Sequence, residues 1–109
     1  MTTKQEYLDS QLNAFLDSLK KKGRAQVTID GYRWMINKVN RRLMDLGIDP
    51  NPRKWTEETV LIIRDRVLGH LRMPVARREM SVLSTYAQFH RNTVIKDMAA
   101  EAEAGAKDG

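Results

Sequence analysis

Apolar residues recur at intervals of three and four along the first 46 residues, which is the spacing of one face of an α-helix. This pattern predicts a first helix over residues 4–22 and a second over residues 29–46, with Thr28 as the N-cap of the second. Gly23 and Gly47 follow these two segments, where glycine permits the left-handed conformation that ends a helix. The apolar stripes consist of Leu8, Leu12, Phe15, Leu16 and Leu19, and of Ile29, Tyr32, Ile36, Val39, Leu43 and Leu46.

The same spacing predicts two more helices after a break. Residues 49–54 contain two prolines and are expected to form a loop. A third helix, capped by Thr56, is expected to end at about residues 70–72. A fourth should begin at Pro74, which suits the first helical position, and should reach Met98.

No segment alternates between apolar and polar residues as a half-buried strand does. We therefore expect an all-α fold, a single orthogonal bundle of four or five helices over residues 1–98. Residues 99–109 show no apolar periodicity, and they are expected to form a flexible tail or the start of an interdomain linker. A chain of 109 residues has room for one such domain.

Composition excludes several classes of protein and site. There is no cysteine for a disulfide or a thiolate metal site, no apolar window long enough to span a membrane, and no apolar signal core at the N-terminus. His70 and His90 are isolated from each other, and the adjacent acids Glu57 and Glu58 are explained by the positive end of a helix. We therefore expect a cytoplasmic chain that is not an enzyme, with no cofactor, no bound metal, no membrane contact and no small-molecule substrate.

Charge is the first positive indication of function. Nineteen lysines and arginines stand against fourteen acidic residues, a net charge of +5. Between Lys20 and Lys54 there are ten basic and three acidic residues, whereas residues 97–109 carry a net charge of −3. A basic body of this kind suggests a polyanionic partner, although an ordinary basic surface would have the same composition.

The basic residues form a pattern together with uncharged polar ones. The predicted fourth helix carries a polar face opposite its apolar side, and arginine and hydroxyl groups in that arrangement suit phosphates and base edges. This face consists of Arg77, Arg78, Ser81, Ser84, Thr85 and Gln88. Lys22, Arg24, Gln26 and Arg33 lie similarly around the start of the second helix. Gly31 in that region either reflects the tolerance of helix starts for glycine or allows a ligand to approach the backbone closely.

Three segments, in this order and spacing, resemble the N-terminal core-binding domain of tyrosine recombinases, the phage-integrase and Xer-like group. They are Gln-Val-Thr-Ile-Asp-Gly-Tyr-Arg at residues 26–33, Trp-Thr-Glu-Glu at residues 55–58, and Arg-Glu-Met-Ser-Val-Leu-Ser-Thr-Tyr at residues 78–86. The family typically shows a turn leading into Thr-x-x-x-Tyr-Arg, a Thr-x-x-Asp/Glu helix start and an Arg-x-x-Ser-x-Leu helix. The similarity covers about residues 5–96.

The resemblance implies a SAM-like bundle that lies on one side of a recombination site, with its second and fourth helices facing the major groove. Its expected partners are double-stranded DNA and other recombinase protomers, which would place the protein at the nucleoid. With the residues chosen from charge, the predicted DNA-binding set is Lys22, Arg24, Gln26, Thr28, Gly31, Arg33, Arg77, Arg78, Ser81 and Ser84. Asp30 departs from the polar or basic residue expected at such a contact, and Pro74 and Val75 replace the usual polar approach to the last helix.

The family's nucleophilic tyrosine and its catalytic arginines and histidines belong to a second, C-terminal domain that completes a clamp around the DNA. A chain of 109 residues cannot hold that domain as well. The sequence therefore predicts either a fragment of a recombinase, which we favour, or a stand-alone domain. In both cases the chain is expected to bind DNA without cutting it.

Two other functions remain open from the sequence. SAM-like bundles also pair with proteins, and Trp34 and Met35 flank the apolar stripe of the second helix, where an exposed apolar patch would suit a protein partner. A helix-turn-helix DNA-binding protein is a weaker alternative, because no short turn joins two helices with the expected recognition pattern.

Overall fold

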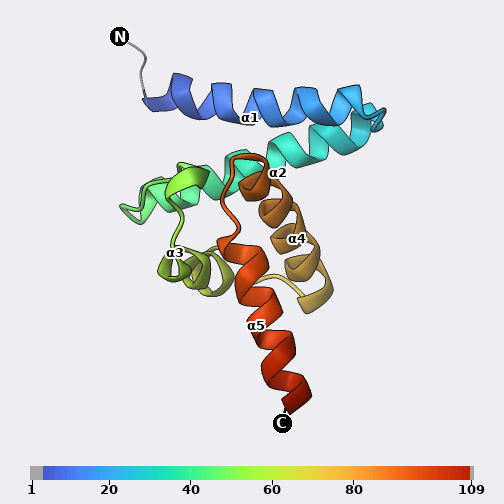
Figure 1. The fold of residues 1–109 in the computed structure, drawn as a ribbon. Helices are drawn as coiled ribbons and strands as arrows, with labels where there is room; N and C mark the ends of the chain where they lie inside the picture. The colour runs from blue at the N-terminus through green and yellow to red at the C-terminus, as the bar shows by residue number, and fades with distance from the viewer. Residues whose placement is uncertain (1–3, 109) are drawn as a thin grey trace. The chain divides into compact units, whose positions relative to one another are not determined.

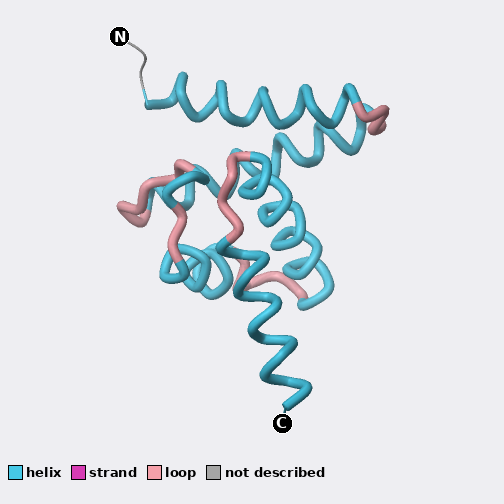
Figure 2. Tube along the Cα trace, in the orientation of Figure 1, coloured by secondary structure: helices cyan, strands magenta, loops and turns pink. Residues whose placement is uncertain are grey.

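The computed structural model describes residues 4–108 of the chain, and this part is helical with no strand, which confirms the all-α prediction (Figures 1 and 2). Its five α-helices are α1 (Lys4–Lys21), α2 (Gln26–Asp45), α3 (Glu57–Ile62), α4 (Met73–Phe89) and α5 (Val94–Asp108), with a 3₁₀ turn η1 (Pro52–Lys54) and a π-helical turn η2 (Ile63–Val67). The chain separates into two compact units, residues 1–51 and 52–109, and each is described by itself. No helix in the described part is both long and apolar enough to cross a membrane.

The first unit is a hairpin of the two long helices α1 and α2, which run antiparallel in Figure 1. Gly23 adopts a φ of 82°, its N–H donates to the Lys20 carbonyl at 3.0 Å, and the Arg24 N–H donates to the Leu19 carbonyl at 3.1 Å. These two bonds are the Schellman pattern that ends a helix. Gly47 ends α2 in the same way, with a φ of 74°. Both predicted glycine stops are confirmed.

The start of α2 differs from the prediction. The helix begins at Gln26, and its N-cap is Ala25. Ala25 has an extended backbone and makes no capping hydrogen bond through its side chain. Thr28 is therefore the third helical residue, and the predicted cap is wrong. The apolar stripe starts only at Ile29, because the exposed Val27 and its polar neighbours add a helical turn that buries nothing. Periodicity cannot detect a turn of that kind.

The second unit opens with short elements. The segment predicted as a loop contains η1, a single 3₁₀ turn that begins at Pro52. Thr56 caps α3 as predicted, and its hydroxyl and that of Thr59 each accept from the other's backbone N–H, which forms a capping box. The third helix was predicted to end at about residues 70–72, but α3 ends at Ile62. The π-helical turn η2 follows it directly, and there the Leu68 N–H donates to the Ile63 carbonyl at 2.8 Å.

The predicted fourth helix is in fact two helices. α4 starts at Met73 and ends at Phe89, and Arg91 follows in the left-handed region with a φ of 66°. The Asn92 side chain holds the break: its Nδ2 donates to the carbonyls of Pro52 at 2.8 Å and Trp55 at 3.0 Å, and its Oδ1 accepts from the Val94 N–H at 2.9 Å. The sequence prediction missed this break because no glycine or proline marks it.

α5 continues as a helix to Asp108, so the predicted helix end at Met98 is wrong. Residues 99–104 are Ala-Ala-Glu-Ala-Glu-Ala, and alanine and glutamate have high intrinsic helix propensity even without an apolar face to bury. The predicted boundary between domain and tail falls inside this helix.

Aromatic side chains form the centre of the second unit. The Tyr86 ring is fully buried, with its centroid 6.1 Å from that of Trp55 and 5.2 Å from that of His90, both in edge-to-face geometry. Burial of the phenol raises the pKa of Tyr86, because the charged form is poorly solvated there. Phe89, three residues after Tyr86 on α4, is 42% exposed.

Candidate nucleic-acid interface

All of the predicted DNA-binding residues lie at the protein surface, divided between the two units. In the first unit Lys22, Arg24, Gln26, Gly31 and Arg33 are exposed and Thr28 is half-buried; in the second Arg77, Arg78 and Ser81 are exposed and Ser84 is half-buried. The two sets are described separately because they belong to different units.

The second set forms a continuous surface, which we call the α4 polar face: Arg77, Arg78, Ser81, Ser84, Thr85 and Gln88. Arg77, Ser81, Ser84 and Gln88 follow one another at intervals of four, three and four, so they form one row along the helix. The opposite side of α4 contains the buried residues of the helix, Val82, Leu83, Tyr86 and Ala87.

Two of the polar groups on this face are already engaged within the helix. The Gln88 amide donates to the Ser84 hydroxyl at 3.0 Å, and the Thr85 hydroxyl donates to the Ser81 carbonyl at 3.1 Å. Both bonds are exposed to solvent, where exchange for a ligand's hydrogen bonds has a low net free-energy cost. The face is therefore a set of short hydrogen-bonding groups next to two cations.

The start of α4 carries more positive charge than the sequence prediction assigned. Arg72 is the N-cap residue, with an extended backbone and an exposed side chain, and it precedes Arg77 and Arg78 by about one and a half helical turns. Neither Arg77 nor Arg78 takes part in an ion pair between residues that the structure describes. Arg72 was not among the predicted residues; the sequence signal for it is Pro74, which favours a helix start close to Arg72.

In the first unit, the predicted residues separate into two groups. Lys22 and Arg24 lie in the exposed turn between α1 and α2, directly after the exposed Lys20 and Lys21 at the end of α1, and we call residues 20–24 the basic turn. Gln26 and Arg33 follow on α2, but each has a partner on the chain.

Those partners are close. The Gln26 amide donates to the Asp30 carboxylate at 2.9 Å, and Arg33 donates through Nη1 to the Asn13 amide oxygen of α1 at 2.9 Å. A ligand would have to compete with both bonds, so the basic turn is the stronger candidate contact in this unit.

The helix starts distinguish α2 and α4 from the other helices of the described chain. Neither has an acidic residue in its first turn, and neither has a side-chain cap. The first turns of α1, α3 and α5 contain Glu6, Glu57 with Glu58, and Asp97, respectively. Backbone N–H groups and the helix dipole make an uncapped N-terminus favourable for an anion, and an acidic residue in the first turn opposes this.

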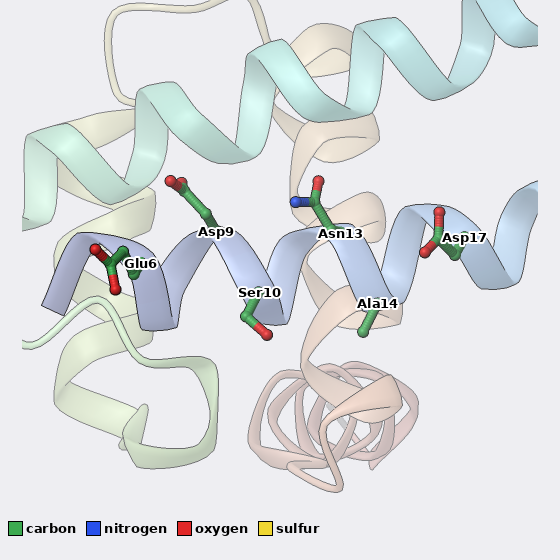
Figure 3. Close-up of a pocket in the computed structure, with 6 residues that line it drawn as sticks. All are labelled: Glu6, Asp9, Ser10, Asn13, Ala14 and Asp17. Atoms are coloured by element: carbon green, nitrogen blue, oxygen red, sulfur yellow. The ribbon is translucent and has the colours of Figure 1, made fainter. Parts of the chain in front are cut away.

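α1 presents a surface of the opposite charge. An open depression along this helix is lined by Glu6, Asp9, Ser10, Asn13, Ala14 and Asp17 (Figure 3). Asp9 and Asn13 project toward α2, and Asn13 is the residue that accepts from Arg33 (Figure 3). Three carboxylates along the depression make it unsuitable for a phosphate backbone.

No group of three or more metal-ligating side chains comes together among the described residues. His70 is exposed, whereas His90 is buried between the edges of the Tyr86 and Phe89 rings, with centroid distances of 5.2 and 5.0 Å. His90 is therefore a packing residue of the second unit.

The apolar patch suggested by Trp34 and Met35 is only half present. Met35 is buried at 5% exposure, whereas Trp34 is 62% exposed on the solvent side of α2. The Lys38 ammonium lies 4.7 Å from the centroid of the Trp34 ring, which is cation–π geometry.

Comparison of the chain with protein-family models, with curated proteins and with solved structures finds no match. The resemblance to tyrosine recombinases therefore rests on the three sequence segments alone.

Proposed function

We propose that this chain binds double-stranded DNA through the basic turn and the α4 polar face. The observation that carries the proposal is the combination at α4: an uncapped helix start without acidic residues, three exposed arginines around it, and a row of short polar side chains behind them. Arginine and lysine neutralise phosphates and supply most of the affinity. Arginine forks, serine hydroxyls and the glutamine amide are groups that read base edges in a major groove.

The likeness to the core-binding domain of tyrosine recombinases supports a more specific role. In that role the chain grips one side of a recombination site at the nucleoid, and strand cleavage belongs to a catalytic domain elsewhere. Binding by this chain alone would be weak, because a one-sided contact lacks the avidity of a closed clamp.

The test is the affinity of two double variants for a short duplex. Arg77→Ala with Arg78→Ala should weaken binding at least ~5-fold, since one good arginine–base pair contributes ~1–3 kcal/mol. Lys22→Ala with Arg24→Ala should weaken it as well, through lost phosphate contacts. Fluorescence anisotropy with a labelled duplex measures both, and circular dichroism verifies that the variants are folded.

Arg66→Ala with Lys96→Ala is the matched control, because it removes two exposed positive charges from the second unit but none from the α4 polar face. It should bind nearly as well as the unmodified chain. Equal losses in the control and in the Arg77/Arg78 variant would reduce the proposal to non-specific attraction by net charge.

A protein-interaction module is the second candidate, and the exposed Trp34 is the observation that favours it. That function predicts a molecular mass that rises with concentration and little salt dependence toward duplex DNA, so sedimentation with and without DNA separates the two candidates.

A further inference from the structure

Trp34 is an exposed aromatic side chain on a helix surface that is mostly polar. It is 62% exposed, whereas the chain's other tryptophan, Trp55, is 3% exposed. A large apolar ring left in water is unfavourable on its own, so a contact that covers it would be stabilising.

The surroundings of the ring are open on one side. Gly31 lies one helical turn before Trp34, and a Cβ added to Gly31 would meet nothing within 4 Å. The Trp34 side chain is therefore not within 4 Å of that position, and the helix surface beside the ring on the Gly31 side is open to solvent. A flat ligand could reach the ring there without displacing part of the protein.

The charges around Trp34 select the kind of ligand. Lys38 lies over the ring at 4.7 Å, and Arg41 follows on the same side of α2, seven residues after Trp34. The nearest acidic residue on this side, Asp30, accepts from the neutral Gln26 amide and keeps its charge, so the two cations exceed it by one. An anionic group beside an aromatic platform is therefore favoured.

A protein partner fits this surface less well. Besides Trp34, α2 exposes one other large apolar residue, Val27, which lies two turns away. Leu46 is also exposed, but it follows the end of the helix. One ring among basic and polar groups is too small an apolar surface for a stable protein contact, which buries ~800 Å² on each partner. A nucleotide needs only one ring face and a cation for its phosphate.

We infer that Trp34 is a stacking platform for an unpaired nucleobase, with Lys38 and Arg41 beside it to contact the phosphates of a single-stranded segment. This inference deepens the proposed function: it adds recognition of unpaired nucleotides next to the duplex. Stacking on an aromatic ring tolerates any base, so the site would recognise strand state and not sequence.

The experiment compares two DNA hairpins that share one duplex, one with a blunt end and one with a single-stranded extension of eight thymidines. The unmodified chain should bind the extended hairpin ~10-fold more tightly, which corresponds to ~1.4 kcal/mol. Its tryptophan emission should be quenched by the extended hairpin and much less by the blunt one, because Trp55 is buried and unable to stack.

Three variants make the test specific. Trp34→Ala should bind both hairpins equally, within ~2-fold, while it retains the affinity for the blunt hairpin. Trp34→Phe should keep part of the preference for the extension, because a smaller ring still stacks. Tyr7→Ala removes another exposed aromatic of the same unit and should change nothing.

A preference for the extension that survives in Trp34→Ala would overturn the inference, as would equal quenching by the two hairpins. Loss of self-association in Trp34→Ala, without a change in DNA binding, would also overturn it, since the ring would then contact a second copy of the chain. If the blunt hairpin is not bound at all, the proposed function fails. The eight-thymidine strand alone then tests Trp34 independently.

Discussion

At the scale of single residues, two glycines differ in what a side chain would meet. Neither Gly31 nor Gly69 has a positive φ, so both could accept alanine on backbone grounds. A Cβ at Gly31 meets open space, whereas a Cβ at Gly69 would collide with the backbone carbonyl oxygen of Asp65 in η2. The same substitution should therefore have opposite effects at the two sites.

Gly31→Ala should raise the free energy of unfolding by up to ~1 kcal/mol, because alanine favours the helix over glycine. Gly69→Ala should lower it by ~1–3 kcal/mol, because the methyl group has to push the backbone of η2 aside. Urea unfolding monitored by circular dichroism measures both. A loss of stability in Gly31→Ala would mean that something packs against that position.

Arg91 shows where residue-level rules fail. Sequence rules place helix ends at glycine, and they succeed at Gly23 and Gly47, where φ is positive. Arg91 adopts a φ of 66° with a side chain attached, so nothing in its type indicates the turn. The cost of that conformation is offset by the hydrogen bonds of the next residue.

At the scale of elements, Asn92 joins three parts of the second unit. Its amide nitrogen donates to the carbonyls of Pro52 and Trp55 near η1, and its side-chain oxygen receives the Val94 N–H at the start of α5. The ends of η1, α4 and α5 are therefore held together by one side chain.

Asn92→Ala removes these three hydrogen bonds and should lower the free energy of unfolding by ~2–3 kcal/mol, at ~1 kcal/mol for each bond. Asn92→Asp keeps the acceptor for Val94 but loses both donors, and it should also be strongly destabilised. Thermal unfolding measures both variants. Thr93→Ala, which loses only the exposed bond from Thr93 to Asp97, is the control and should change stability little. Similar melting temperatures for Asn92→Ala and the control would refute the role of Asn92.

The spacing of apolar residues predicts the bounds of a helix well when one face of that helix is buried along its whole length. α1 carries an unbroken buried stripe, and α2 carries one from Ile29 to Leu43 in which Tyr32 is half-buried; the predicted last member, Leu46, is exposed just after the helix. The ends of both helices lie within a few residues of the prediction. α3 is shorter than expected, because the π turn of η2 shifts the helical phase while the apolar residues Ile63 and Val67 remain buried. A count of intervals cannot distinguish such a turn from a regular helix.

At the scale of the whole molecule, both units contribute basic surface. Residues 1–51 carry nine basic and six acidic side chains, and residues 52–96 carry nine and four. If the basic turn and the α4 polar face both contact phosphates, the two units should contribute separate shares of the salt dependence of DNA binding.

The logarithm of the association constant for duplex DNA should fall linearly with the logarithm of the salt concentration. Each double variant, Lys22/Arg24 or Arg77/Arg78 to alanine, should reduce the magnitude of that slope by ~2 if both of its residues contact phosphates, and by less where a residue contacts a base. Anisotropy titrations at four salt concentrations give the slopes. An unchanged slope in a folded double variant would remove that surface from the interface.

Local sequence was enough to predict the helical class, the extent of α1, the C-terminal end of α2, the Thr56 cap and the surface position of the polar residues on α4. These features depend on neighbours within about one helical turn, which the order of residues fixes. Tertiary structure decided the break between α4 and α5, the burial of Met35 beside the exposed Trp34, and the engagement of Arg33 by Asn13. Those outcomes depend on groups that are distant in the chain: Asn92 ends a helix by bonding carbonyls 40 and 37 residues earlier, and only the folded backbone brings them within reach.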